Sequence, residues 1–160
     1  MAGIFQVSEV VAIAVEIERR GERFYLDMAE RATNPKVKEG LVYLASEEVR
    51  HRKVYEDLLS RLRSMELPPG SGESEYWSYV NDLIDSHFLF DTAQSERLFS
   101  AATSDQEVVR LAMGFEKESI LFFTEMKGLV PGEEAAVIDT CIQEERTHLR
   151  RLGQLLKSIT

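Results

Sequence analysis

Two copies of one short motif carry the side chains in this sequence that are best suited to chemistry. Each copy is a pair of glutamates with a histidine three residues after the second one, at residues 47–51 (Glu-Glu-Val-Arg-His) and 144–148 (Glu-Glu-Arg-Thr-His). On a helix, a spacing of three residues places the second glutamate and the histidine on one face, where both can reach the same ion. Carboxylates and imidazoles bind divalent transition metals, so the two motifs predict metal binding.

A second pair of glutamates occupies matching positions in an internal repeat. Residues 14–25 align with residues 112–123 at an offset of 98, which places Glu18 over Glu116, and the two Glu-Glu-x-x-His motifs align at an offset of 97. The repeat predicts two related helical hairpins that face each other. Gly21 and Ser119 follow these glutamates by three residues and are both small, so we expect open space beside the metal at both positions.

Helical periodicity predicts that the glutamates and histidines point into the core. Four segments carry apolar residues at alternating spacings of three and four, and polar residues interrupt each apolar line near its middle. An ionised carboxylate in an apolar interior is costly unless it is protonated, paired or bound to a cation. Two divalent ions would balance four glutamates, and two neutral imidazoles would add ligands without changing the charge. The residues that this arrangement brings together are Glu18, Glu48, His51, Glu116, Glu145 and His148.

The elements that position these residues are four long helices in one all-α domain that spans residues 1–160. We expect the helices at about residues 8–33, 35–65, 104–130 and 131–159, with Ser8 and Asn34 as caps and Pro35 and Pro131 as first helical residues. The connection at residues 66–103 is long enough to cross along the bundle, and it contains one predicted short helix at residues 75–88. No segment shows the sustained alternation of a strand.

One glutamate on each of two helices and a Glu-x-x-His motif on each of the other two is the pattern of ferritin-like carboxylate proteins. At these residues the chain resembles the ferritin-like diiron superfamily, and it looks most like rubrerythrin-like proteins that lack a rubredoxin domain. The resemblance implies a ferritin-like four-helix bundle in which the six residues bind two iron ions, with Glu48 and Glu145 as bridges between them. Manganese or zinc could bind the same ligands. Tyr25, seven residues after Glu18, lies where ferritin-like proteins often carry a tyrosine near the metal.

The resemblance implies a non-haem diiron oxidoreductase that reduces hydrogen peroxide or dioxygen with electrons from an external donor. Two alternatives stay open: a ferroxidase or iron-handling protein, for which ferrous iron is the substrate, and a non-enzymatic metal-binding or interaction bundle. Rubrerythrins with strong peroxidase activity usually carry an extra glutamate at the position of Ser119. Glu47 and Glu144 either orient a histidine on the neighbouring helix or are simply exposed.

The overall composition argues against some classes of partner and favours one cellular compartment. A formal net charge of −9 leaves no basic stripe for nucleic acid, and one cysteine in 160 residues forms neither an internal disulfide nor a CxxC metal site. The apolar run at residues 10–15 is too short to span a membrane. We therefore expect a cytoplasmic protein without nucleic-acid or membrane partners. The aromatic residues and the length of the connection predict a homodimer, in which helices can be exchanged between subunits.

Overall fold

The computed structural model describes residues 7–62, 75–87 and 89–160, and every regular element in these residues is a helix. The prediction of an all-α fold is therefore confirmed. The elements are α1 (Val7–Arg31), α2 (Pro35–Arg61), α3 (Glu75–Ser86), α4 (Thr92–Ala101), α5 (Asp105–Lys127) and α6 (Gly132–Ile159).

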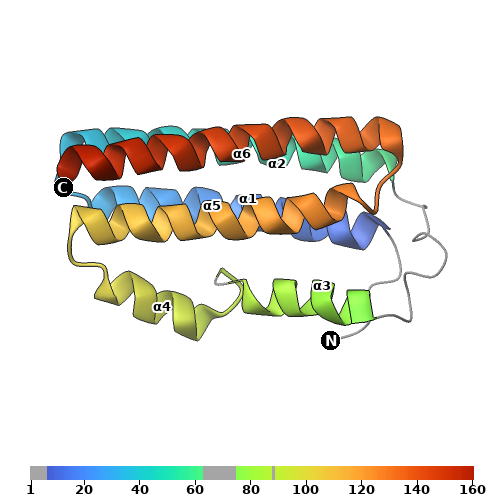
Figure 1. The fold of residues 1–160 in the computed structure, drawn as a ribbon, viewed down its shortest axis with the longest axis horizontal. Helices are drawn as coiled ribbons and strands as arrows, with labels where there is room; N and C mark the ends of the chain where they lie inside the picture. The colour runs from blue at the N-terminus through green and yellow to red at the C-terminus, as the bar shows by residue number, and fades with distance from the viewer. Residues whose placement is uncertain (1–6, 63–74, 88) are drawn as a thin grey trace.

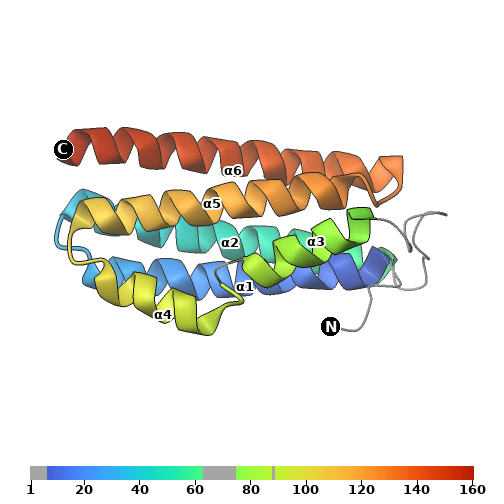
Figure 2. The ribbon, with the colours of Figure 1, turned by 60° about the horizontal axis from the view of Figure 1, so that its bottom comes forward.

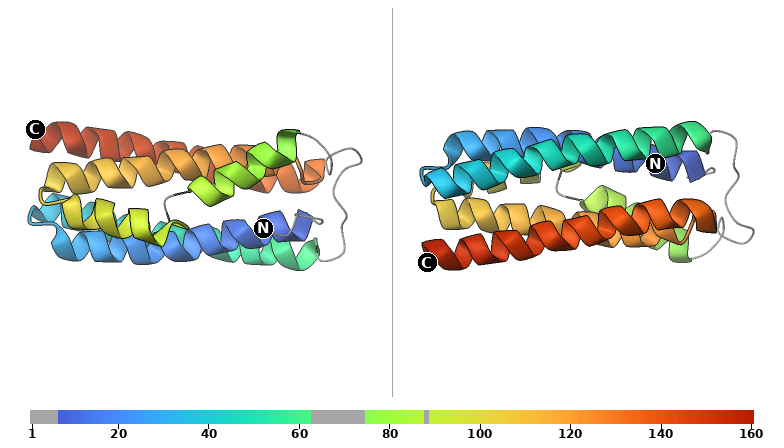
Figure 3. Two further views of the ribbon diagram at one scale, coloured as in Figure 1. Left: turned by 90° about the horizontal axis from the view of Figure 1, so that it is seen from below. Right: turned by 90° about the horizontal axis from the view of Figure 1, so that it is seen from above.

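The four long helices form an elongated bundle, and the two short ones cover one of its sides. Figure 1 shows three layers, with α2 and α6 in the first, α1 and α5 in the second, and α3 and α4 on the outer face of α1 and α5. Within the bundle α1 packs against α2 and α5, and α6 packs against the same two helices. The turned view in Figure 2 and the two opposite views in Figure 3 show that α3 and α4 together run from one end of the bundle to the other. The described part of the connection thus crosses along the bundle, as predicted.

Short polar caps determine where two of the long helices, α2 and α5, begin, whereas Ser8, the predicted cap of the first helix, lies inside α1. Asn34 caps α2 by accepting a hydrogen bond from the Lys36 backbone N–H, and Pro35 is the first residue of that helix. Ser104 caps α5 in a reciprocal capping box with Glu107. The carboxylate of Asp105 accepts hydrogen bonds from Thr33 and Asn34, which ties the start of α5 to the turn between α1 and α2. The two hairpins are therefore joined at one end by specific hydrogen bonds as well as by packing.

The observed helix ends differ from the predicted ones by a few residues. Helix α1 ends at Arg31, two residues earlier than expected, and α5 ends at Lys127 because Gly128 and Leu129 form a turn with hydrogen bonds back to Glu125 and Met126. Helix α6 begins at Gly132, and Pro131 is its N-cap residue instead of its first helical residue. The predicted last residues of the second helix, at 63–65, lie outside the described residues.

The connection contains two described helices, whereas we expected one. Helix α4 was missed because its ten residues contain too few apolar positions to give a clear helical period. A local signal exists, because Asp91 caps this helix by accepting a hydrogen bond from the Gln94 backbone N–H. Helix α3 also ends at Ser86 instead of residue 88.

Apolar side chains fill the bundle on both sides of a buried polar layer. Along the antiparallel helices, fully buried apolar residues lie before and after this layer, and they include Val11, Leu58 and Ile138 toward one end and Met28, Leu41 and Val109 toward the other. Tight apolar packing above and below holds the four backbones in register, so the polar layer is built on rigid elements. None of the described helices is both long and apolar enough to cross a membrane.

Candidate metal centre

The buried polar layer consists of the six residues that the sequence predicted. The structure brings all of them together at mid-bundle, and each is at most 2% exposed. Their ligand atoms form two overlapping groups, and within each group the atoms lie within 4.8 Å of one another. The first group is Glu18, Glu48, His51 and Glu145, and the second is Glu48, Glu116, Glu145 and His148. Because Glu48 and Glu145 belong to both groups, this arrangement can hold two neighbouring ions that share two carboxylates.

Both histidines turn the same ring nitrogen toward the carboxylates. The Nδ1 atom of His51 lies 2.7 Å from Oε1 of Glu145 and 3.9 Å from Oε1 of Glu18. On the other side of the layer, Nδ1 of His148 lies 3.0 Å from Oε2 of Glu145 and 3.7 Å from Oε1 of Glu116. The nitrogen that faces the centre is therefore Nδ1 in both cases, and Nε2 points outward.

The hydrogen bonds inside the layer leave many polar atoms unsatisfied. Both carboxylate oxygens of Glu18 and Glu48 and one oxygen of Glu116 have no hydrogen-bond partner among the described residues. Nδ1 of His51 and Oε1 of Glu145 have only each other, at 2.7 Å. Leaving one such buried group unpaired costs roughly 1–3 kcal/mol, and more if it is charged. Unpaired oxygen and nitrogen atoms that converge on one place are the donor set of a divalent transition metal. The residues present therefore fit two divalent cations.

The pKa values of the buried glutamates and of His51 indicate which side chains of the layer carry protons when no metal is bound. Burial raises the pKa of Glu18 to about 7, and burial together with the neighbouring carboxylates raises the pKa of Glu48 and of Glu116 well above its ordinary value. Burial acts in the same direction on Glu145, but contacts with His148 and His51 outweigh it and hold the pKa of Glu145 below its usual range. Burial disfavours the charged form of His51, yet the contact with Glu145 outweighs it and raises the pKa of His51 to about 9. Protons thus occupy sites that cations would take, so metal binding must release protons.

Tyr25 lies beside the carboxylates, at the position that the sequence indicated. Its side chain is fully buried, and its hydroxyl donates a short hydrogen bond to Oε1 of Glu116. Burial and the nearby Glu116 carboxylate raise the pKa of Tyr25, so the phenol keeps its proton. The matching residue in the repeat, Phe123, has no hydroxyl and packs against Tyr55 with ring centroids 5.0 Å apart. The two halves of the centre therefore differ in their nearest hydroxyl group.

The expectation of open space beside both small residues is wrong at Gly21. A Cβ atom at this position would lie 2.6 Å from Cζ of Phe115 and 3.2 Å from Oε2 of Glu48. An aromatic ring from α5 thus fills the space that the missing side chain leaves. Ser119 is buried, and its hydroxyl has no hydrogen-bond partner among the described residues. The repeat could not reveal this difference, because the ring comes from a neighbouring helix.

Of the two interpretations left open for Glu47 and Glu144, the structure favours contact with the histidines of the neighbouring helix. Oε2 of Glu144 lies 2.8 Å from Nε2 of His51, and Oε2 of Glu47 lies 3.6 Å from Nε2 of His148. A carboxylate on the outer nitrogen of a histidine fixes the ring orientation and the position of the proton. Arg50 contacts both of these glutamates, and the sequence indicated only its spacing of three residues from Glu47.

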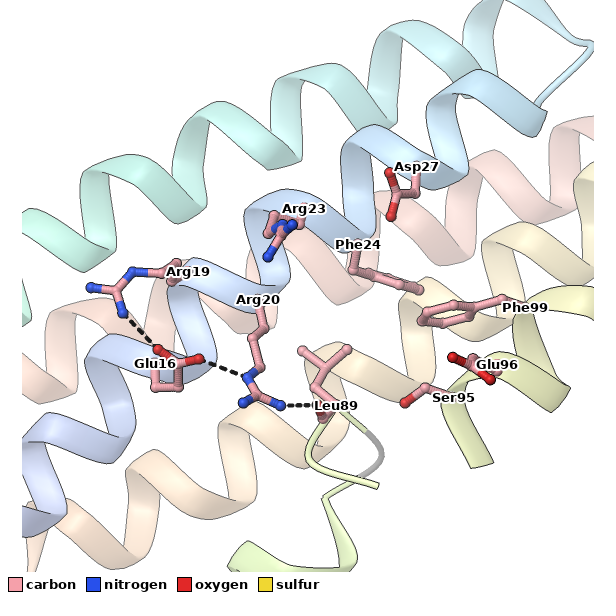
Figure 4. A pocket seen from close by; sticks show the side chains of 10 residues that line it. All are labelled: Glu16, Arg19, Arg20, Arg23, Phe24, Asp27, Leu89, Ser95, Glu96 and Phe99. Atoms are coloured by element: carbon pink, nitrogen blue, oxygen red, sulfur yellow. Dashed lines mark hydrogen bonds and ion pairs between the residues drawn. The ribbon is translucent and has the colours of Figure 1, made fainter. Parts of the chain in front are cut away.

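A groove on the described surface lies elsewhere, between α1 and α4. Its volume is about 510 Å³, and the rings of Phe24 and Phe99 in its lining pack against each other with centroids 5.3 Å apart. Figure 4 shows these two rings side by side and three arginines that approach from α1. Two of these arginines, Arg19 and Arg20, are already paired with Glu16, and Arg20 also donates to the carbonyl oxygen of Leu89. None of the six buried polar residues lines this groove, so we assign the chemistry to the buried layer.

Comparison with known proteins agrees with this geometry. The family model named Rubrerythrin matches residues 9–156 of the chain. A crystal structure from Thermotoga maritima, named as that of a ferritin-like diiron-carboxylate protein, superposes with a TM-score of 0.67 and 24% sequence identity over 100% of this chain and 99% of that one. This similarity establishes a ferritin-like fold. No match was found among curated proteins. Since the family model spans nearly all of the four-helix bundle and both Glu-Glu-x-x-His motifs, the chain belongs to the rubrerythrin family.

Proposed function

We propose that this protein is a non-haem diiron oxidoreductase that reduces hydrogen peroxide or dioxygen. The observation that carries the proposal is the pair of overlapping ligand groups, which share Glu48 and Glu145. Both oxygens of Glu18, both of Glu48 and one of Glu116 have no hydrogen-bond partner among the described residues. A neutral buried layer would not need four carboxylates, whereas two divalent ions would balance them charge for charge. The name of the structurally similar Thermotoga protein supports iron as the metal in this chain as well.

Each ligand has a distinct role in this proposal. Glu18 and His51 would hold one ion, Glu116 and His148 would hold the other, and the two shared glutamates would serve both. The histidines would bind through Nδ1, which faces the carboxylates. When bound, the iron pair supplies the electrons for the reduction.

The remaining residues of the centre handle protons and exclude water. Reduction of peroxide to water consumes two protons, and the hydroxyl of Tyr25 already donates to a carboxylate oxygen of Glu116, which is a proposed metal ligand. Tyr25 can therefore hold a proton at this oxygen and release it as negative charge develops nearby. The rings of Phe24, Phe115 and Phe123 are buried around the centre and exclude bulk water from it. The proposal requires an electron source outside these 160 residues, because their one cysteine cannot form a four-cysteine iron site or a redox dithiol.

Anaerobic loading with ferrous iron, followed by separate stopped-flow mixing with peroxide and with dioxygen, tests the proposal. We expect two iron ions per subunit, rapid oxidation by at least one oxidant, and full retention of iron afterwards. Iron that leaves the protein after oxidation would identify ferrous iron as the substrate and support a ferroxidase. Loaded protein that reacts no faster than free iron would support the non-enzymatic bundle.

A further inference from the structure

A hydrogen-bonded network covers the outer side of the two histidines, between α2 and α6. Its centre is Arg50, whose Nη2 atom lies 2.7 Å from Oε2 of Glu47 and 2.9 Å from Oε2 of Glu144. Its Nε atom lies 3.3 Å from the second oxygen of Glu47. One guanidinium on α2 therefore contacts a carboxylate on its own helix and a carboxylate on the neighbouring helix.

Each of these carboxylates faces the outer nitrogen of a different histidine. Glu144 lies 2.8 Å from Nε2 of His51, and Glu47 lies 3.6 Å from Nε2 of His148. A neutral imidazole carries one N–H and one lone pair, so a carboxylate that accepts the N–H at Nε2 leaves the lone pair on Nδ1. In the metal-bound state, where Nδ1 has no proton, that lone pair would face the proposed metal positions. Glu144 would then fix the tautomer of His51 by a hydrogen bond, and Glu47, beyond hydrogen-bond distance, would favour the same tautomer of His148 by its charge.

Arg50 also lies close to the histidine on its own helix. Its Nη2 atom is 3.4 Å from Nε2 of His51. A guanidinium has only donors, so a hydrogen bond here would place the lone pair of His51 on Nε2 and the proton on Nδ1, which excludes metal. The shorter distance to Glu144 favours the opposite tautomer, with Arg50 bound to the carboxylate and not to the ring. Arg50 therefore favours metal binding only while its guanidinium binds the carboxylate of Glu144 and not the ring of His51.

We propose that Arg50 is a positioning residue that orients both metal-binding histidines at once, through Glu47 and Glu144. The internal repeat indicates that one arginine serves both histidines, because the position that matches Arg50 on α6 is Thr147. The hydroxyl of Thr147 donates to the carbonyl oxygen of Gln143 on its own helix and does not serve the network. The planar fork of an arginine can bind two carboxylates in fixed geometry, which a lysine ammonium cannot do. The inference rests on the proposed metal site.

Exposure shows that the contribution of Arg50 lies in orientation more than in stability. The side chain of Arg50 is 46% exposed, that of Glu144 is 32% exposed and that of Glu47 is 17% exposed. Ion pairs this open to solvent contribute little to folding, because water and salt screen them. The histidines behind them are buried, however, so a small rotation of either ring changes the direction of its lone pair. Substitution of Arg50 should therefore change metal binding more than the melting temperature of the metal-free protein.

Arg61 provides a matched control on the same helix. It pairs with Asp57 on α2 and lies 2.9 Å from Glu134 on α6, and its side chain is 40% exposed. The two arginines thus bridge the same pair of helices with similar exposure, but Arg61 is not in contact with a histidine. Any loss of metal affinity that is specific to Arg50 must then come from the histidine network.

The test is an anaerobic titration of the metal-free protein with cobalt(II), followed by its visible absorption, on wild type, Arg50→Gln and Arg61→Gln. We expect two binding steps in wild type, a weakening of about 10- to 100-fold in both steps for Arg50→Gln, and no change for Arg61→Gln. The Arg50→Lys variant keeps the charge but not the fork, so it should restore at most one of the two steps. Adding Arg50→Gln to Glu144→Gln should cause no further loss at the step that involves His51, because both act through one path.

The outcomes separate this inference from the proposed function. Wild-type protein that binds fewer than two cobalt ions would refute the metal site and the inference with it. If wild type binds two ions and Arg50→Gln binds them as tightly, the inference alone is wrong. A loss confined to one step, or an equal loss in Arg61→Gln, would also overturn the shared role of Arg50. A spectrum whose ligand-field bands move in Arg50→Gln but not in Arg61→Gln would support it.

Discussion

Replacing Gly21 by alanine should damage both the fold and the metal centre, although alanine is the better helix former. Gly21 lies inside α1, where an exposed Gly→Ala change would stabilise the helix by about 0.8–1.0 kcal/mol. Here the added Cβ atom would lie 2.6 Å from Cζ and 3.0 Å from Cε1 of Phe115. These distances are far below van der Waals contact, so either the ring or the α1 backbone must move.

The surroundings of Phe115 determine the size of the effect. The ring is buried and packs between Phe24 and Tyr25, with centroid distances of 5.6 and 5.5 Å, and His87 lies 6.0 Å away on a further side. Forcing an extra carbon into such a core costs about 1–3 kcal/mol, and the closeness of this contact places it in the upper part of that range. After the gain in helix propensity, we expect a net loss of about 1–2 kcal/mol in the free energy of unfolding.

Gly114 supplies the control for this experiment. It lies inside α5, and a Cβ atom there would meet nothing within 4 Å, so Gly114→Ala should be neutral or stabilise by up to about 1 kcal/mol. For a chain of this size, a difference of about 1–3 kcal/mol between the two variants corresponds to melting temperatures roughly 2–12 °C apart. Thermal melts of the metal-free proteins measure this separation.

The same substitution should also affect the metal centre, because the new Cβ atom would lie 3.2 Å from Oε2 of Glu48. Glu48 is a proposed bridge, so Gly21→Ala should bind metal more weakly than Gly114→Ala. A Gly21→Ala protein that melts at or above the temperature of wild type would refute the steric argument. Unchanged metal affinity in a destabilised variant would show that Phe115 moves and Glu48 does not.

Three further predictions concern the protons and the oxidant. As pH rises from about 4.5 to about 7, the metal-free protein should lose up to roughly 3 kcal/mol of stability from Glu18 alone, because its carboxyl ionises in the unfolded chain but, with its raised pKa, stays protonated in the fold. Metal should abolish this loss. Parallel profiles of melting temperature against pH with and without metal would contradict the prediction. Tyr25→Phe removes the donor to Glu116 and should destabilise the metal-free protein by about 1–3 kcal/mol in denaturant unfolding, whereas an unchanged midpoint would show that the hydrogen bond is dispensable. Ser119→Glu should raise the peroxide rate relative to the dioxygen rate at equal iron loading, and an unchanged ratio in stopped-flow mixing would show that Ser119 only packs in the core.

The sequence predicted the buried polar layer because two independent patterns agree on it. Helical periodicity places each of the six residues on a core-facing line, and the internal repeat doubles the evidence by pairing Glu18 with Glu116 and the two Glu-Glu-x-x-His motifs with each other. The first pattern is found within single helices and the second by aligning two segments of the sequence, so neither requires knowledge of how the helices pack. The same is true of the cap at Asn34, which depends only on a local hydrogen bond.

Features that depend on contacts between helices could not be predicted in the same way. The role of Gly21 is set by the Phe115 ring, which comes from α5, and the contact of Arg50 with Glu144 depends on the rotation of α2 against α6. In the sequence, Arg50 is visible only as a partner of Glu47 on its own helix. Helix α4 was missed for a different reason, because its ten residues contain too few apolar positions to show a helical period.

The claim on which the proposed function depends is that Glu48 and Glu145 are shared by two metal ions. The most direct test is the number of iron ions bound per subunit after anaerobic ferrous loading and removal of free metal, in wild type and in the Glu48→Ala, Glu145→Ala double variant. The overlapping ligand groups predict two ions in wild type and none in the double variant, because each bridge serves both ions. One ion in wild type, or two ions in the double variant, would contradict the dinuclear centre.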